Sequence, residues 1–263
     1  MNDITLINMS IARRFGKKVL FERNSVGIFY LVAVLEKAGF KVNFHEHFLD
    51  HKRSFPEELR RFIRLVNNPS NLVGIGCHSV HLPFVVLAVK EIKRLFPQKK
   101  VILGGIGPSS VARELLKTFD FIDAVAVGEA EDTILEVVEK RGQDFKGIKG
   151  VVYRDGKMVH ANALRLPIEN LDRLAYPAYQ AVDFKRYQIP TVITSRGCPF
   201  GCPFCCLSSF WGRKIRYRSI DNVIEELRLL VERYGRKYVF FGDSTFITEP
   251  DRMVKLCHRL KKE

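Results

Sequence analysis

The run Arg196-Gly-Cys-Pro-Phe-Gly-Cys-Pro-Phe-Cys205 is the most informative stretch of this 263-residue chain, because it spaces three cysteines as C-x-x-x-C-x-x-C. These cysteines are Cys198, Cys202 and Cys205. Three thiolates within eight residues can surround one compact inorganic core, and a four-iron cube is normally held by four cysteines. The spacing therefore predicts an iron–sulfur cluster in which one iron has no cysteine ligand from this run.

Two other chemistries of cysteine fit this chain less well. A structural zinc ion needs four closed ligands, and Cys206 is the only nearby candidate, although adjacent cysteines rarely reach one tetrahedral ion. The six cysteines form an even set, but disulfide frameworks belong to small secreted domains, and we expect no secretory signal here. We interpret Cys77, Cys206 and Cys257 as ordinary semi-buried thiols.

The cysteine run, with Phe204 before its last cysteine, closely resembles the signature of the radical S-adenosylmethionine (radical SAM) enzymes. The resemblance implies a redox-active 4Fe-4S cluster whose open iron is chelated by the amino and carboxylate groups of S-adenosylmethionine. It also implies that Phe204 lies at this cofactor and that an electron donor such as flavodoxin or ferredoxin supplies the reducing electron. No residue of the sequence is identified as catalytic.

The composition predicts a cytoplasmic protein of two domains. Hydrophobic residues make up 46% of the chain, and no apolar stretch is long enough to span a membrane. The net charge of +14 raises nucleic acid as a partner, but Lys and Arg are spread along most predicted helices beside acidic residues. We therefore expect a small-molecule substrate and keep an RNA-modifying enzyme as a weaker alternative.

Residues 1–145 repeat a strand, a loop and a helix five times, which predicts a doubly wound α/β domain with a five-stranded parallel sheet of Rossmann or flavodoxin-like order. The predicted strands are residues 4–9, 41–47, 72–77, 100–106 and 123–128. The predicted helices are residues 26–38, 56–67, 83–96, 109–119 and 131–140. Ligands of such sheets bind beyond the carboxyl ends of the strands, so we expect the loops after the strands, including residues 10–25, to bind a ligand.

Together these loops resemble the cobalamin-binding domain found in one branch of the radical SAM enzymes. The resemblance implies that cobalamin contacts a small set of loop residues, namely Ser79, Gly104, Gly105, Gly128 and Glu129. Many cobalamin proteins supply an axial histidine after the first strand, whereas residues 10–25 contain none. We therefore expect cobalamin to bind without a histidine from that loop.

Two histidines, His78 and His81, follow the third predicted strand and could coordinate a metal. A pair of loop histidines is more often only hydrogen-bonded, and we favour that interpretation. The basic run at residues 213–218 has three open interpretations: it raises the potential of a nearby cluster, it binds an acidic substrate, or it is a solvated face.

Residues 146–185 predict a connector, with a hairpin turn at Asp155-Gly156 and a strap at residues 166–177 that lies against both domains. Residues 186–263 predict the first two βα units of a partial TIM-like radical SAM barrel. Its strands are residues 191–194 and 237–242, and its helices begin after Ser219 and near Pro250. The resemblance implies that Gly242, Asp243 and Ser244 contact the amino group of S-adenosylmethionine; a turn or capping role for Asp243 is the alternative.

The 66 residues from Cys198 to the end provide two βα units, whereas a partial barrel of this family needs about six. The sequence thus predicts a fragment, or a chain whose barrel is completed by a second chain. The leading hypothesis is a radical SAM enzyme, with or without cobalamin, that methylates or otherwise modifies an unknown substrate. A non-catalytic corrinoid- or nucleotide-binding module is the alternative.

Overall fold

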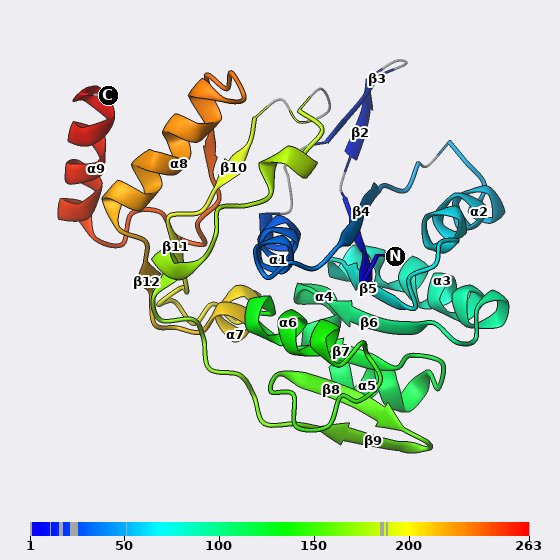
Figure 1. The fold of residues 1–263 in the computed structure, drawn as a ribbon. Helices are drawn as coiled ribbons and strands as arrows, with labels where there is room; N and C mark the ends of the chain where they lie inside the picture. Colours follow the sequence, from blue (N-terminus) through cyan, green and yellow to red (C-terminus); the bar gives the residue numbers. More distant parts are fainter. Residues whose placement is uncertain are drawn as a thin grey trace.

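The computed structural model describes residues 2–10, 12–15, 18–21, 26–50, 52–184, 187 and 189–262. A large sheet with helices on both faces forms the first part of the chain, and a smaller region with α8 and α9 lies beside it (Figure 1). The two regions meet through α1 (Val26–Lys37), the connector, and the hydrogen bonds of Arg196 and Arg216 to Glu129. This arrangement places the cysteine run next to the first domain.

The sheet follows the strand order β4-β1-β5-β6-β7-β8-β9. Its first five strands are parallel and have the flavodoxin-like order that the sequence predicted. The hairpin predicted in the connector pairs antiparallel with β7 and so adds two strands to the sheet. The strands are β1 Ile4–Met9, β4 Val42–His47, β5 Leu72–Gly76, β6 Lys100–Gly104, β7 Ala124–Ala126, β8 Val151–Asp155 and β9 Met158–Ala161.

The helices of the first domain agree with the sequence prediction except at one place. They are α1 Val26–Lys37, α2 Phe55–Val66, α3 Leu82–Leu95, α4 Ile106–Ser110, α5 Ala112–Thr118 and α6 Glu131–Glu139. The helix predicted at residues 109–119 is two helices, because Gly105 with φ +91° starts a helix earlier and Val111 with φ −133° interrupts it. Within the predicted loop 10–25, β2 Ala12–Phe15 pairs with β3 Lys18–Phe21.

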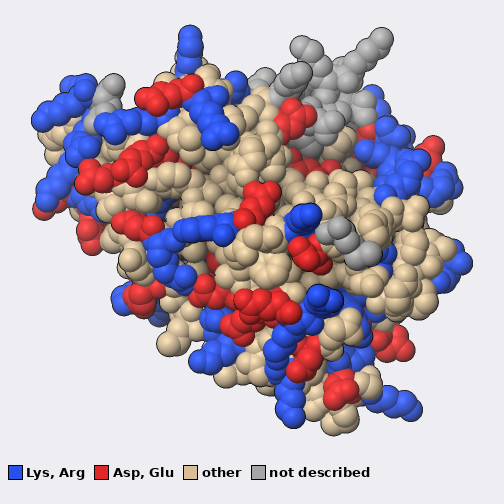
Figure 2. Space-filling view, in the orientation of Figure 1, with Lys and Arg blue, Asp and Glu red and all other residues tan. Residues whose placement is uncertain are grey.

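Charged side chains of both signs lie close together over much of the face in Figure 2. Lys and Arg are therefore interleaved with Asp and Glu there, as the sequence pattern indicated. Within the part of the chain that the structure describes, no helix is long and apolar enough to cross a membrane.

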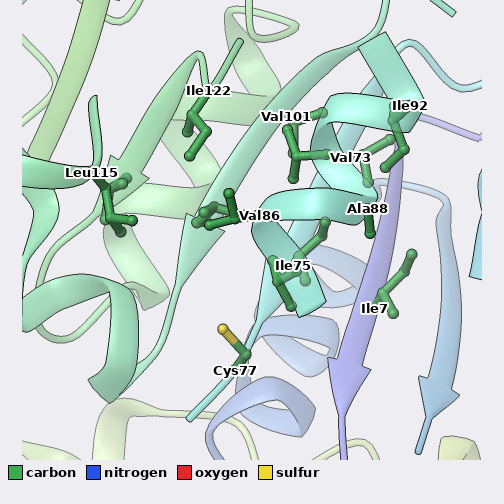
Figure 3. Packing of buried hydrophobic residues seen from close by; sticks show 14 of the residues in the cluster. Ile7, Val73, Ile75, Cys77, Val86, Ala88, Ile92, Val101, Leu115 and Ile122 are labelled. Carbon is green, nitrogen blue, oxygen red and sulfur yellow. The ribbon is translucent and has the colours of Figure 1, made fainter. Parts of the chain in front are cut away.

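The core of the first domain consists of apolar side chains on both faces of the sheet. Ile7, Val73 and Ile75 point to the face covered by α2 and α3, where Figure 3 shows them packed around helix residues such as Ala88. Ile4 belongs to the opposite cluster, with α1 and α6. Because successive strand residues face opposite sides, the near-continuous apolar strands of the sequence fill both layers.

The second region contains two short strand pairs. Strand β10 Thr191–Val192 pairs parallel with β13 Phe240–Phe241, and β11 Ser195–Arg196 pairs antiparallel with β12 Arg216–Tyr217. Its helices are α7 Leu207–Trp211, α8 Ile220–Glu232 and α9 Pro250–Lys262. The two predicted βα units are present with shorter strands, and Ser219 caps α8 by accepting a hydrogen bond from Asn222 N at 3.1 Å.

The connector lies against both regions, as predicted. Its 3₁₀ turns are η2 Leu171–Arg173 and η3 Tyr179–Ala181. Leu171 packs with Val26 and Tyr30 of α1, and Tyr179 packs with residues of α8. The connector therefore contributes to the contact that fixes the second region on the first.

Candidate functional site

The cysteines lie on a loop that is closed at its base. We call residues 195–217 the cysteine loop; its ends pair in the register Ser195 with Tyr217 and Arg196 with Arg216. Gly197 has φ +107°, and a Cβ there would come within 2.2 Å of the Lys214 carbonyl oxygen, so only glycine fits. The base of the loop is thus fixed by strand pairing and by close packing at Gly197. The tip of the loop lies outside this pairing and can surround a ligand.

The three motif cysteines differ in exposure, because Cys198 is buried, Cys205 is half-buried and Cys202 is exposed. The Cys205 amide donates to the Cys202 carbonyl oxygen at 3.1 Å, which makes a tight turn of these two residues. Cys198 Sγ lies 3.4 Å from the Thr245 hydroxyl oxygen. The segment after β13 thus contacts Cys198 through Thr245, a residue that the sequence did not single out.

Three free thiols on one loop suit an iron–sulfur cluster. All six cysteines of the chain are free thiols. Among the described residues, no three His, Cys, Asp or Glu side chains are arranged to hold a single metal ion. A four-iron cluster makes a different demand, since each cysteine binds its own iron. The donor set therefore fits a cluster held by one thiol per iron.

The other cysteines differ from the prediction. Cys77 is buried, and burial raises the pKa of its thiol to about 12, so it remains a neutral core side chain. Cys206 and Cys257 are exposed, and their interpretation as semi-buried thiols was wrong. Cys206 is the N-cap residue of α7, and Cys257 lies on α9.

The Asp243 carboxylate ties the end of β13 to the start of the cysteine loop. It accepts hydrogen bonds from Thr194 N at 3.1 Å, Thr194 Oγ1 at 2.9 Å and Ser195 Oγ at 2.5 Å. A Cβ on Gly242 would lie 2.4 Å from a methyl group of Thr191, so this glycine lets the strands approach. Asp243 therefore has the turn-forming contacts named as its alternative role, while Gly242 and Ser244 line a cavity of about 20 Å³ beside Arg196.

A larger cavity of about 420 Å³ opens beside the first half of the cysteine loop. It is lined by Pro199, Phe200 and Arg213 on the loop and by residues 247–249 after β13. This volume lies within the usual range of small-molecule pockets. Phe204 is 90% exposed at the loop tip, where a bound molecule could cover its ring.

The basic run after the cysteines is not a solvated face throughout. Arg213 and Lys214 are exposed, but Arg216 and Arg218 are each only 4% exposed. The solvated interpretation is therefore wrong for Arg216 and Arg218. Periodicity could not reveal this for Arg216, because its partner Glu129 lies 87 positions away in the chain, whereas the partner of Arg218, Glu226, lies on the helix that follows it.

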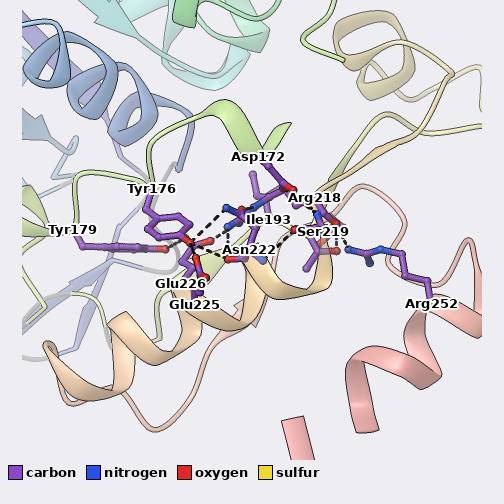
Figure 4. Close-up of polar contacts among 12 residues, drawn as sticks. Asp172, Tyr176, Tyr179, Ile193, Arg218, Ser219, Asn222, Glu225, Glu226 and Arg252 are labelled. Carbon is purple, nitrogen blue, oxygen red and sulfur yellow. Dashed lines mark hydrogen bonds and ion pairs between the residues drawn. The ribbon is translucent and has the colours of Figure 1, made fainter. Parts of the chain in front are cut away.

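Arg218 links α8, α9, the segment after β10 and the connector (Figure 4). Its guanidinium pairs with Glu226 and donates to the Ile193 carbonyl oxygen at 2.8 Å. Glu226 also accepts from the Tyr179 hydroxyl at 2.5 Å, and burial and Glu226 together raise the pKa of Tyr179 well above its usual value. Arg252 of α9 donates to the Arg218 carbonyl oxygen at 2.8 Å. One buried arginine thus organises the neighbourhood of α8.

Arg196 and Arg216 contact the loop after β7. Arg196 donates to Glu129 at 3.0 Å and to Glu131 at 2.5 Å, and Arg216 donates to the other oxygen of Glu129. The Arg196 guanidinium lies 5.1 Å from the ring centroids of both Tyr30 and Trp211. Burial lowers the pKa of Arg196, but Glu131 and Glu129 more than offset this and raise it. The sequence analysis named Glu129 for another role and missed its arginine partners.

The residues predicted to contact cobalamin gather at the carboxyl edge of β5, β6 and β7. Ser79 is exposed on the turn after β5, Gly104 is the last residue of β6, and Gly105 follows it. A Cβ on Gly105 would lie 2.8 Å from the Cys77 carbonyl oxygen, so close packing of two turns requires this glycine. Gly128 has φ +78° and open space beside it. The edge therefore exposes a polar turn and small residues on three adjacent strands.

The two loop histidines lie on the same turn as Ser79 and differ in burial. His78 is exposed, whereas His81 is buried, and burial lowers the pKa of His81. Neither belongs to a metal-binding group of three His, Cys, Asp or Glu within the described part of the chain.

Comparison with family models gives two matches along the chain. Residues 15–138 match the B12 binding domain, and residues 192–263 match the radical SAM superfamily. An uncharacterized methyltransferase of Pyrococcus horikoshii is 32% identical over 73% of this chain and 44% of that protein. The anaerobic magnesium-protoporphyrin IX monomethyl ester cyclase of Rubrivivax gelatinosus is 28% identical over 72% of this chain and 36% of that protein. The chain spans less than half the length of these relatives.

Two solved structures have the same arrangement of both regions. The radical S-adenosylmethionine methyltransferase TsrM from Kitasatospora setae, with cobalamin and a [4Fe-4S] cluster bound, aligns with a TM-score of 0.73 at 17% identity. It covers all of this chain and 51% of its own. The cobalamin-dependent S-adenosylmethionine radical enzyme OxsB aligns with a TM-score of 0.78 at 18% identity over 99% of this chain and 37% of its own. At this identity the two structures establish the shared fold.

Proposed function

Because this chain belongs to the radical SAM superfamily, in the branch with an N-terminal B12-binding domain, we propose that it uses a 4Fe-4S cluster and S-adenosylmethionine for methyl transfer or another radical modification. Cys198, Cys202 and Cys205 hold the cluster. The observation that carries this proposal is the loop of three free cysteines whose base is closed by β11 and β12. When bound, the cluster supplies the electron that cleaves S-adenosylmethionine.

The chain's own residues orient the cofactor in this proposal. Gly242 and Ser244 line the small cavity beside the cysteine loop and contact the amino end of S-adenosylmethionine. Asp243 holds the turn through its three hydrogen bonds, so its carboxylate acts by placing the neighbouring groups. Phe204 covers the cofactor from the loop tip, where its ring is free of protein contacts that would bury it.

Cobalamin binds, in this proposal, at the carboxyl edge of the large sheet. The exposed Ser79 and the glycines Gly104, Gly105 and Gly128 form the contact surface on three adjacent strands. The loop of residues 10–25 contains no histidine, so no axial histidine comes from it. The same edge carries Glu129, whose carboxylate faces the arginines of the cysteine loop.

The substrate is proposed to be a small molecule, with flavodoxin or ferredoxin as electron donor in the cytoplasm. The relatives include a cyclase and methyltransferases that act on different compounds, such as the cytidylyl-2-hydroxyethylphosphonate methyltransferase of Streptomyces wedmorensis. The cavity beside Pro199 and Phe200 has the size for such a ligand. Domain limits of 1–145, 146–185 and 186–263 remain our proposal, with the hairpin β8-β9 packed on the first sheet.

The test is reductive cleavage of S-adenosylmethionine by anaerobically reconstituted protein. We expect 5′-deoxyadenosine and methionine when dithionite or reduced flavodoxin is present, and neither product from the Cys198→Ala variant. Titration with hydroxocobalamin, followed by its absorption spectrum, tests the second site separately. Cobalamin binding without any product from S-adenosylmethionine would contradict the enzyme and favour the non-catalytic corrinoid module.

A further inference from the structure

A buried ionic cluster joins the two regions of the molecule where their proposed cofactor sites face each other. It consists of Glu129 in the loop before α6, of Glu131 at the start of α6, and of Arg196 and Arg216 in the cysteine loop. Each of these side chains is at most 4% exposed. Two carboxylates and two guanidinium groups balance in formal charge, and all four are taken from water. We call this cluster the interdomain clamp.

The geometry of the clamp directs it at the cysteine loop. Arg196 and Arg216 are partners in the β11-β12 register, so they stand side by side at the base of the loop. Both donate to the Glu129 carboxylate, one to each oxygen. Cys198 is two residues beyond Arg196. Movement of the loop base relative to β7 must therefore break contacts to the same carboxylate.

The connector also forms hydrogen bonds with residues of the interdomain clamp. The Ile168 amide donates to Glu129 at 3.3 Å, and its carbonyl oxygen accepts from Arg216 at 2.7 Å. Arg216 also donates to the Trp211 carbonyl oxygen at 3.0 Å, inside the cysteine loop. Each of the four charged side chains thus has at least one oppositely charged partner, which is the condition under which buried charges define one orientation.

We propose that Glu129 and Glu131 are positioning residues that fix the cysteine loop on the cobalamin-facing edge of the sheet, and that Glu129 does not itself contact cobalamin. The proposal rests on the proposed function for the identity of the two cofactors, but the clamp itself is a property of the chain. Asp243 and Thr245, in the segment after β13, hold the same loop from within the second region. The clamp supplies the hold from the first domain.

Hydrogen–deuterium exchange of the cofactor-free full chain tests the clamp directly. The Glu129→Gln variant keeps the size of the side chain and removes its charge, which leaves a buried arginine charge without balance. We expect exchange at residues 195–198 and 216–218 to accelerate by roughly tenfold to a hundredfold, while β5 exchanges as in the original protein. Global destabilisation would instead accelerate both sets of amides, and that result would overturn the proposal.

Two further variants sharpen this experiment. Glu169→Gln is the matched control, because Glu169 joins the connector to Lys214 of the same loop through an ion pair whose side chains are 65% and 74% exposed. We expect it to leave exchange at the loop base unchanged. In the double variant Glu129→Gln with Arg216→Gln the charges balance again, and exchange should be slower than in Glu129→Gln alone. Additive acceleration in the double variant would contradict a shared clamp.

Cofactor measurements separate the clamp from the proposed function. In reconstituted protein we expect Glu129→Gln to change the g values of the reduced cluster and to keep the affinity for hydroxocobalamin within about threefold, whereas Glu169→Gln changes neither. Loss of hydroxocobalamin binding with unchanged exchange at the loop base would overturn the clamp and make Glu129 a cobalamin contact. A wild-type protein that assembles no cluster would contradict the proposed function, and the exchange result would still decide the clamp. If Glu129→Gln does not fold, Glu131→Gln, which removes one of Arg196's two partners, replaces it.

Discussion

The two regions of this molecule differ in the kind of buried contact that stabilises each of them. In the first domain, strands such as β5 are buried on both faces among apolar side chains. At the cysteine loop and α8, the buried contacts include Arg196, Arg216 and Arg218 with their carboxylate partners. Apolar burial is non-directional, whereas a buried ion pair is favourable only with its partner in place. The first kind of contact builds a stable platform, and the second fixes how a functional loop lies on it.

The largest loss of stability should come from a substitution in the apolar core of the first domain. Phe62 of α2 is fully buried and contacts the rings of His47 and Phe84 at centroid distances of 5.2 and 5.6 Å. Phe62→Ala should lower the free energy of unfolding by about 3–5 kcal/mol, because it removes apolar contacts and leaves a cavity. Urea denaturation measures this. The control Leu164→Ala, at a side chain 73% exposed, should change it by less than about 0.5 kcal/mol.

A slightly smaller effect should follow from breaking the ionic side of the comparison. Glu226→Gln removes the charge that balances Arg218 and should cost about 3 kcal/mol. Its neighbour Glu225 is exposed and accepts a hydrogen bond from Tyr176, so Glu225→Gln is a matched control that should cost less than about 1 kcal/mol. Equal losses for the two variants in urea denaturation would show that burial of the Arg218 pair is not what stabilises this region.

The smallest effect concerns a titratable group inside the apolar platform. Burial, with lesser contributions from Arg61 and His81, lowers the pKa of His47 from its usual 6.5 to about 4, and this effect outweighs the buried Glu58 carboxylate oxygen that lies 3.2 Å from its Nε2. The folded state therefore binds this proton less tightly than the unfolded chain, so the contribution of His47 to stability is complete above pH 6.5 and declines as the pH falls towards 4. At pH 5 the loss is about 2 kcal/mol.

Urea denaturation at pH 7 and pH 5 measures that loss, and His47→Gln should remove this part of the pH dependence. An unchanged difference between the two pH values in His47→Gln would assign the acid sensitivity to other groups. That result would not affect the conclusion about the apolar core, but it would contradict the assignment of His47 as a buried neutral histidine.

The same difference between the regions explains what the sequence could predict. The five parallel strands and most helices follow from local patterns, since apolar runs, glycines and caps act within a few residues. The clamp joins Glu129 to residues 67 and 87 positions away, and no periodicity reports such a pair. Arg216 and Arg218 therefore resembled a solvated run, whereas the cofactor contact of Asp243 stays a prediction beside its turn-forming hydrogen bonds. The cysteine spacing was visible because its three residues lie close together in the chain.

The cysteine loop as a cluster site is the central claim, and the iron and sulfide content of anaerobically reconstituted protein tests it most directly. We predict about four irons per chain in the original protein and near loss of iron when Cys198, Cys202 and Cys205 are all replaced by alanine. Cys206→Ala, which changes the exposed neighbouring thiol, should keep the full iron content. Iron that is retained in the triple variant, or lost equally in Cys206→Ala, would contradict the assignment of the cluster to these three cysteines.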